Sequence, residues 1–281
     1  MVDYPTVIKN VNEQDISLNS KRQLFSVILV LLDFHKGNPQ MYKKWYGHYK
    51  LEHERISKIL DDELLKNVKT PFQQENWVSW PKLKKIVTST RRKNQKNPSE
   101  ENMLRAVVAA LYLSSNYLPP RRNIYRTFKY YSKDQADPFD VLNNYYWNKK
   151  FYFNITKSGK QEFELNKQSM KITRLIEEYH KLYNKSDWLL QDPVTKQQLS
   201  ESSYKKIIKE ITSSKTHPSG IGVRMLRTIF CTEVANKIND SNLRKLISFR
   251  MGHNISTATK YYDKAYESEE HSIQMKKQQM K

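Results

Sequence analysis

The feature that most constrains the fold is one short stretch of strand character in a chain otherwise patterned for helices. Residues 143–166 hold three aromatic runs separated by turn residues: Asn144-Tyr-Tyr-Trp, Phe151-Tyr-Phe-Asn-Ile and Gln161-Glu-Phe-Glu-Leu. Such runs are typical of short strands joined by hairpin turns. Elsewhere, apolar residues recur at helical spacing between Pro and Gly breaks. The sequence therefore predicts a mainly α (α+β) protein with one small antiparallel sheet.

The helix-patterned segments form two groups with a polar, basic segment between them. Residues 1–16 are predicted to be a tail, 17–88 an N-terminal helical domain and 89–102 a linker that contains Pro98. A second domain is predicted over 103–264, followed by a charged tail at 265–281. The predicted helices are 17–35, 41–69, one starting near Trp80 behind Ser79, one starting near Glu100, and 122–131, 167–185, 201–214, 222–237, 241–251 and 257–267.

The charge balance indicates a polyanionic partner. Lys and Arg number 49 and Asp and Glu 29, which leaves a formal charge of +20. Nucleic acid is the leading candidate, because each phosphate contacted by Lys or Arg releases counterions. Lys43 and Lys44, next to Trp45, are predicted to bind DNA phosphates. The alternative is a lysine-rich surface that is merely solvated.

The composition excludes other classes of protein. The single cysteine, Cys231, rules out an internal disulfide framework and a Cys-built zinc site. The histidines show no metal-ligand spacing, so no metal is expected. No run approaches the ~18 apolar residues of a membrane span, and the first residues lack a secretory pattern. We expect no membrane contact and an intracellular setting: the host nucleus or a viral factory for a viral protein, the cytoplasm or nucleoid for a prokaryotic one.

Three motifs carry chemistry. They are Leu118-Pro-Pro-Arg-Arg-Asn-Ile-Tyr-Arg, Gly222-Val-Arg-Met-Leu-Arg-Thr-Ile-Phe and Met251-Gly-His-Asn-Ile-Ser-Thr-Ala-Thr-Lys-Tyr-Tyr. In this order they resemble the tyrosine recombinase (phage-type integrase) family. The Pro-Pro-Arg-Arg stretch is most similar to integrases of large DNA viruses and virophages. The resemblance covers about residues 17–267, and its specific motifs lie within 118–262.

The resemblance implies a fold, an activity and a set of partners. Residues 17–88 would be the core-DNA-binding domain and 103–264 the catalytic domain. The protein would act on double-stranded DNA as a homo-tetramer and would be a monomer or dimer when it is not bound to DNA. A tyrosine oxygen would attack a phosphodiester and conserve the bond energy as a 3′-phosphotyrosine, so neither metal nor cofactor is required. Residues 265–281 would dock on a neighbouring protomer, unless they are a frayed helical end.

The family pattern assigns the nucleophile and its histidine. Tyr262 lies nine residues after His253, the common family spacing, and is predicted to be the nucleophile. Tyr261, at eight residues, is the alternative. His253 would hydrogen-bond the phosphate or shuttle a proton.

Two arginines are expected to clamp the phosphate oxygens, as a planar guanidinium does better than an ammonium. Arg122 matches the first arginine of the family pattern. Arg121 is the alternative for this role, and if it is not the catalytic arginine it is predicted to contact DNA. Tyr125 stands at a position where an acidic residue is common in the family. Arg227 matches the second. Arg224 replaces a histidine, and it can bind the phosphate but cannot accept a proton.

The general acid of the family is a lysine in a β-turn. Lys157 is predicted for this role, in the turn between the second and third strands, where it would protonate the leaving 5′ oxygen. Lys160 is the other candidate and otherwise a DNA contact.

Two other functions stay open at this point. A type IB topoisomerase-like enzyme would use the same chemistry to relax DNA as a monomer. A non-catalytic DNA-binding or virion protein derived from a recombinase is compatible with Arg224 and Tyr125, which depart from the family pattern. Such a protein would bind DNA with strong salt dependence and form no covalent adduct.

Overall fold

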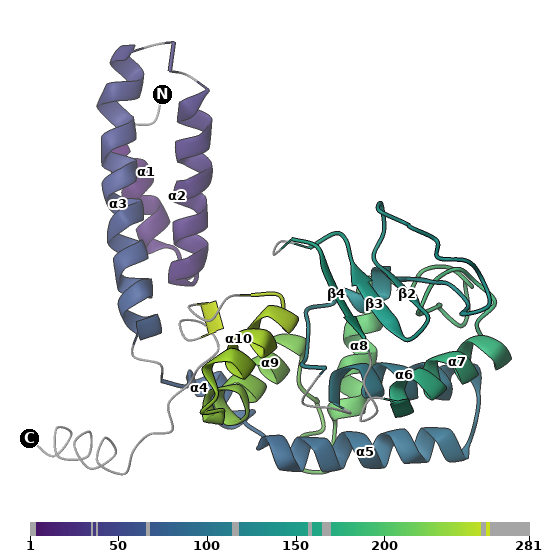
Figure 1. Cartoon of the computed structure of the whole chain (residues 1–281). Coiled ribbons are helices and arrows are strands. Elements are labelled where there is room, and N and C mark those ends of the chain that lie inside the picture. Colours follow the sequence, from purple (N-terminus) through teal and green to yellow (C-terminus); the bar gives the residue numbers. More distant parts are fainter. Residues whose placement is uncertain are drawn as a thin grey trace, which may run out of the picture. The chain divides into compact units, whose positions relative to one another are not determined.

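The computed structural model describes residues 4–34, 36–37, 39–65, 68–113, 118–156, 159–164, 170–253 and 257–258. The chain divides into two compact units, Met1–Val68 and Lys69–Lys281. Both are mainly helical, and the second also contains a small four-stranded sheet (Figure 1). The mainly α class predicted from the sequence is therefore confirmed.

The described residues of the first unit form three helices, α1 (Tyr4–Glu13), α2 (Leu18–Asp33) and α3 (Pro39–Leu65). Ser17 caps α2 as its side chain accepts a hydrogen bond from the Ser20 amide, which confirms the predicted helix start. The three helices pack around a small core whose buried members are Val11, Phe25, Leu32, Tyr49 and Ile56.

The tail predicted over residues 1–16 is wrong, because α1 belongs to this core. Tyr4, Val7, Ile8 and Val11 follow helical spacing and all join the apolar cluster. The Tyr4 ring also stacks on His48 of α3, with ring centroids 3.9 Å apart. A short amphipathic helix therefore precedes α2.

The second unit begins with α4 (Pro71–Glu75) and α5 (Trp80–Lys96). It continues with α6 (Glu100–Leu113), which is buried from Met103 to Leu113 apart from Arg105 and forms the centre of the core. Its other helices lie close to the predicted ranges. They are α7 (Met170–Leu182), α8 (Glu201–Thr212), α9 (Val223–Glu233), the short 3-10 helix η3 (Ala235–Lys237) and α10 (Ser241–Arg250). The helix predicted over 257–267 falls almost wholly outside the described residues.

The linker predicted over 89–102 is also wrong. Residues 89–96 continue α5, and α6 begins at Glu100, so only a short turn separates the two helices. Trp80, Leu83, Val87 and Asn94 recur at helical spacing and bury one face of α5, so the polar, basic run is part of a packed helix and not a linker. The boundary between the units lies near residue 68, so the predicted domain 17–88 is divided.

The sheet has the order β1-β2-β3-β4 and is mixed, not wholly antiparallel as predicted. Strands β2 (Tyr145–Trp147), β3 (Lys150–Phe153) and β4 (Gln161–Glu164) match the predicted runs and pair antiparallel. Asn148 and Lys149 both have positive φ in the β2–β3 turn, as in a two-residue hairpin.

The additional strand β1 (Lys129–Tyr130) pairs parallel with β2 and lies where a helix was predicted over 122–131. Only the 3-10 turn η1 (Tyr125–Thr127) is helical there. The Leu189 amide donates to the Phe128 carbonyl at 2.8 Å, and Lys129 bridges to Trp188. The conformation is therefore fixed by residues about sixty positions later, which local periodicity cannot reveal.

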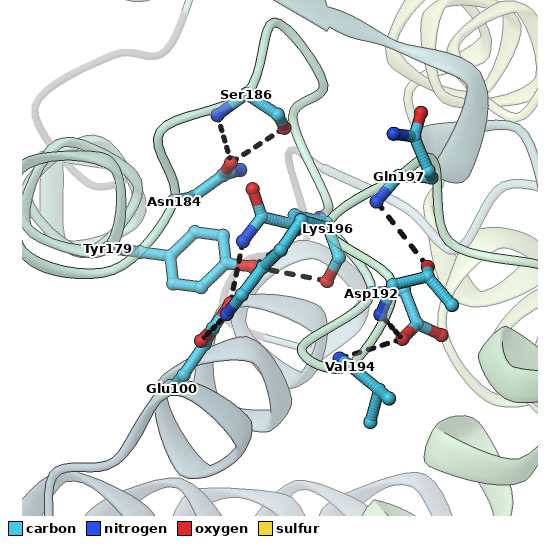
Figure 2. Close-up of polar contacts among 10 residues, drawn as sticks. Glu100, Tyr179, Asn184, Ser186, Asp192, Val194, Lys196 and Gln197 are labelled. Carbon is cyan, nitrogen blue, oxygen red and sulfur yellow. Dashed lines mark hydrogen bonds and ion pairs between the residues drawn. The ribbon is translucent and has the colours of Figure 1, made fainter.

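A polar network fastens the connection between α7 and α8 to the start of α6. The Glu100 carboxylate accepts hydrogen bonds from Gln191 Nε2 at 2.6 Å and from Lys196 Nζ (Figure 2). Asp192 Oδ1 accepts from the Val194 amide at 2.9 Å and so closes the turn that carries Lys196. The network has a structural role, away from the motifs identified in the sequence.

Candidate functional site

Arg227 is the centre of the candidate site. It lies on α9, and its side chain is 1% exposed. Its Nη1 donates to the Pro120 carbonyl at 3.2 Å and to the Met251 carbonyl at 2.9 Å. These two acceptors belong to the first and third sequence motifs, 107 and 24 residues away along the chain. One buried guanidinium therefore joins all three motifs.

Arg121 lies beside this junction and is 2% exposed. Its Nη2 donates to Gln161 Oε1 at the start of β4, and its guanidinium lies over the Phe153 ring, 3.6 Å from the centroid. Burial lowers the pKa of Arg121 to about 10. The electrostatic interaction with the Tyr125 hydroxyl opposes this shift, whereas the positive charges of Arg227 and Arg250 add to it. The three guanidinium groups therefore lie within electrostatic reach of one another.

Gly252 and His253 form the turn that ends α10. Gly252 has φ +75°, a conformation that favours glycine, and its amide donates to the Phe249 carbonyl at 2.9 Å. The His253 amide donates to the Ser248 carbonyl at 3.2 Å. The two bonds are those of a Schellman motif, which fixes the residue after the glycine against the last helical turn. This explains physically why glycine precedes the histidine. His253 is held there, 9% exposed, two residues after the carbonyl that Arg227 binds.

The cluster of Arg121, Arg227, Arg250 and His253, hereafter the arginine cluster, favours an anion. Arg121 and Arg227 are both buried, and the hydrogen bonds described for them go to an amide oxygen and two backbone carbonyls. Charge–charge attraction is stronger in such a desolvated setting than in water. Guanidinium groups bind phosphate oxygens in bidentate fashion, so a phosphodiester is a ligand of fitting chemistry.

The structure separates the two neighbouring arginines of the first motif. Arg121 is buried in the arginine cluster, whereas Arg122 is exposed, although the sequence pattern favoured Arg122 for catalysis. The Arg122 carbonyl accepts a hydrogen bond from the Tyr112 hydroxyl at 3.1 Å, which anchors this turn to α6. Arg224 is also exposed, one helical turn before Arg227 on α9.

Tyr125 belongs to the aromatic core. It is fully buried, with its ring against Tyr112, Phe128, Phe151 and Phe153. Burial raises the pKa of its hydroxyl, and the nearby Arg121 opposes that shift. The position where the sequence pattern led us to look for an acidic residue is therefore occupied by a neutral packing residue.

The β3–β4 turn lies next to the arginine cluster, because Gln161 at its end binds Arg121. Thr156 Oγ1 donates to the Gly159 carbonyl at 2.5 Å across this turn. Lys160 is exposed directly beside Gln161. Lys157, the predicted general acid, belongs to the same turn but lies outside the described residues.

The remaining predicted residues lie elsewhere. Lys43 and Lys44 are exposed on α3 of the first unit. Tyr261 and Tyr262 lie outside the described residues, so the structure does not place the predicted nucleophile relative to the arginine cluster.

Two members of the site were missed in the sequence. Gln161 was interpreted only as part of a strand, and no local signal marks it as a partner of Arg121. Arg250 carried a usable signal, because it is a basic residue in the last turn of α10, directly before Met251-Gly252.

Comparisons with protein-family models, curated proteins and solved structures found no match to this chain. Within the described part of the chain, no group of three or more His, Cys, Asp or Glu side chains is arranged to hold a metal ion. In that same part, no helix combines the length and the apolar character that a bilayer crossing requires.

Proposed function

We propose that the protein is a site-specific DNA recombinase of the integrase type, which breaks and rejoins DNA through a 3′-phosphotyrosine intermediate. The observation that carries the proposal is the pair of hydrogen bonds from Arg227 to the Pro120 and Met251 carbonyls. These bonds bring together three motifs that a recombinase would need in one site and that a simple DNA-binding module would not.

In the proposed reaction, Arg121 and Arg227 hold the non-bridging oxygens of the scissile phosphate. The Tyr262 hydroxyl gives up its proton, for which His253 is the candidate acceptor, as its oxygen attacks phosphorus. A Tyr–O–P bond forms, and the bond from phosphorus to the 5′ oxygen breaks. The departing 5′ oxygen takes up a proton, for which Lys157 is the candidate donor. Attack by a 5′ hydroxyl of the partner strand reverses these steps and releases the tyrosine, with no net change in the number of phosphodiester bonds.

The arginine pair would act on the transition state. Negative charge builds up on the phosphate oxygens as the tyrosine attacks, and preorganised, desolvated donors stabilise such charge most effectively. We assign the first arginine of the pair to Arg121 because its guanidinium lies in the cluster, while Arg122 is exposed and suited to a backbone contact outside it. His253, held by the turn at Gly252, would add a hydrogen bond to the same phosphate.

The partner is double-stranded DNA, and strand exchange would involve four copies of the chain on two duplexes. Lys160 and Arg224 are exposed on the second unit and would contact the phosphate backbone there, and Lys43 and Lys44 are exposed on α3 and would contact phosphates through the first unit. Neither a metal nor a cofactor enters the proposed chemistry, because the phosphotyrosine bond stores the energy for rejoining.

The replacement of histidine by Arg224 favours a second candidate, a DNA-binding protein that has lost catalysis. An exposed arginine at this position can bind phosphate but cannot act as a base. The two candidates differ in one product, the covalent protein–DNA adduct.

Covalent trapping tests the proposal. The protein is incubated with nicked AT-rich duplexes or supercoiled plasmid, without metal or ATP, and the reaction is stopped with detergent. We expect a covalent adduct with the wild-type chain and with Tyr261→Phe, and none with Tyr262→Phe. DNA affinity should change less than twofold in either variant, because only a hydroxyl is removed. Tight binding without any adduct, across a library of duplex sequences, would favour the non-catalytic candidate. Plasmid relaxation by a monomer, without strand exchange, would instead indicate a topoisomerase.

A further inference from the structure

Helix α5 carries a second concentration of positive charge. Its 17 residues include seven Lys or Arg and no Asp or Glu. Trp80, Leu83, Val87 and Asn94 are buried on its inner face, Arg91 is half-buried beside them, and Lys82, Lys85, Arg92, Lys93 and Lys96 are exposed. The basic side chains are Lys82, Lys84, Lys85, Arg91, Arg92, Lys93 and Lys96.

The outer face of α5 is hollowed. An open hollow of about 750 Å³ lies along it, and the lining residues that the structure describes all belong to α5: Lys84, Lys85, Thr88, Ser89, Arg92, Lys93 and Lys96. At about 1.5 Å of rise per residue, its ends are roughly 18 Å apart. We call this surface the α5 face. Its cations and its two hydroxyl side chains are the groups that commonly contact nucleic-acid phosphates.

The like charges of the α5 face lie close together. Arg92 and Lys96 are four residues apart and Lys93 and Lys96 three, spacings at which like charges destabilise an isolated helix. Burial lowers the pKa of Arg91, and the charge of Arg92 adds to this shift. Within the part of the chain that the structure describes, the ion pairs include none to Lys85, Arg92, Lys93 or Lys96. A polyanion laid along this face would relieve the repulsion.

The α5 face is separate from the arginine cluster. Arg121 rests on Phe153 of β3 and Gln161 of β4, which are in the sheet. Figure 1 shows α5 along the edge of the second unit that is farthest from the sheet, with α6 on the side toward the strands. A helix with its side chains is about 10 Å thick. The first turn of α5 contacts α9, which carries Arg227, through Trp80 and Phe230, whereas the α5 face consists of later residues of the helix. We therefore infer that its cations meet a different length of nucleic acid from the one at the arginine cluster.

We propose that the α5 face binds the phosphate backbone of a double-stranded nucleic acid segment other than the one held at the arginine cluster. An 18 Å length of duplex carries roughly ten phosphates, which gives several cations a partner at once. An acidic protein segment fits less well, because the lining residues that the structure describes are cations, one threonine and one serine, whereas protein interfaces bury apolar and aromatic side chains at their centres. The proposal requires DNA binding but not cleavage, so it does not depend on the proposed chemistry.

The test compares two variants of the full chain with equal loss of charge. The first removes four cations of the α5 face, Lys85→Ala, Arg92→Ala, Lys93→Ala and Lys96→Ala. The matched control removes four scattered, exposed lysines of the same unit, Lys133→Ala, Lys171→Ala, Lys181→Ala and Lys206→Ala. All of these positions except Lys133 lie in helices, which alanine favours, and Lys133 is exposed in a turn, so both variants should fold, and their melting temperatures check this.

Affinity for a long duplex is measured at several salt concentrations. Each lost phosphate contact reduces the magnitude of the slope of log K against log salt by about 0.9. Compared with the wild type, the slope should therefore be smaller by about 3 to 4 in the α5 variant and by less than 1 in the control. The pair Arg92→Ala and Lys96→Ala alone should lose about 2. Equal slopes in the α5 variant and the control would overturn the proposal and leave an acidic protein as the partner to test.

A second readout separates this proposal from the catalytic one. Bead-bound duplex, saturated with protein, is incubated with a labelled second duplex, and the captured label is counted. The α5 variant should capture at least tenfold less label than the control, while its covalent adduct on a short nicked duplex stays within twofold. Loss of the adduct in both variants would concern only the proposed chemistry, whereas equal capture of label would refute the α5 interface.

Discussion

Replacement of Arg227 separates its structural role from its proposed catalytic role. Arg227→Ala removes a buried guanidinium and leaves the carbonyls of Pro120 and Met251 without the donor described for them. A buried acceptor without its partner costs about 1–3 kcal/mol, and the lost side-chain methylenes add about 1–2 kcal/mol. Relief of the desolvated charge offsets part of this.

We expect Arg227→Ala to lower the free energy of unfolding by about 3 kcal/mol, which lowers the melting temperature of a domain of this size by about 6–12 °C. Arg227→Lys keeps the charge and one donor group, so it should melt within a few degrees of the wild type. Cleavage should nevertheless fall at least a hundredfold, about 2.7 kcal/mol in the barrier, because an ammonium cannot bind two phosphate oxygens in the planar geometry of a guanidinium.

The assays are calorimetry for stability and single-turnover trapping on a nicked duplex for cleavage, with both variants measured at saturating protein. A stable Arg227→Lys variant that cleaves within threefold of the wild type would refute the clamp, because charge alone would then suffice. An Arg227→Ala variant that melts like the wild type would refute the inference that its two hydrogen bonds hold the motifs together.

Two further predictions follow from the geometry. Arg121→Lys should lower cleavage at least a hundredfold. Arg122→Ala should weaken DNA binding modestly, reduce the slope of log K against log salt by about 1 and leave cleavage at saturating protein nearly unchanged. A large loss of cleavage in Arg122→Ala and a small one in Arg121→Lys would instead identify Arg122 as the first arginine of the clamp. Burial lowers the pKa of His180 to about 3, so the unfolded chain binds a proton that the folded chain excludes. Unfolding free energy should therefore fall by about 1.4 kcal/mol per pH unit as the pH drops from about 6.5 toward 3, and a His180→Gln variant with an unchanged slope in acid titration would contradict this.

The strands and most helices of the second unit could be predicted because their signals are local. The aromatic runs around Asn148-Lys149 specify a hairpin through a turn with two positive φ angles. Residues 122–131 were misassigned because their conformation depends on pairing with Tyr145 and on a hydrogen bond from Leu189, both distant in the sequence. Contacts of this range override local helical periodicity.

The candidate site was predictable where its residues lie in motifs and not where they meet across the fold. Arg227 and His253 were identified from their sequence context. Arg121 and Arg122 are adjacent in an irregular segment, so only the packing against Phe153 and Gln161 shows which of them is buried. The sequence interpretation therefore left both arginines as candidates.

The most direct test of the central claim is the position of a nucleotide on the protein. After the trapping reaction, the DNA is digested with nuclease and the protein with trypsin, which cleaves after Lys260 and Lys264 and leaves both tyrosines in the peptide 261–264. Mass spectrometry with fragmentation should find a nucleotide 3′-phosphate on Tyr262. A nucleotide on another residue, or an unmodified peptide from a preparation that binds DNA tightly, would contradict the proposed recombinase.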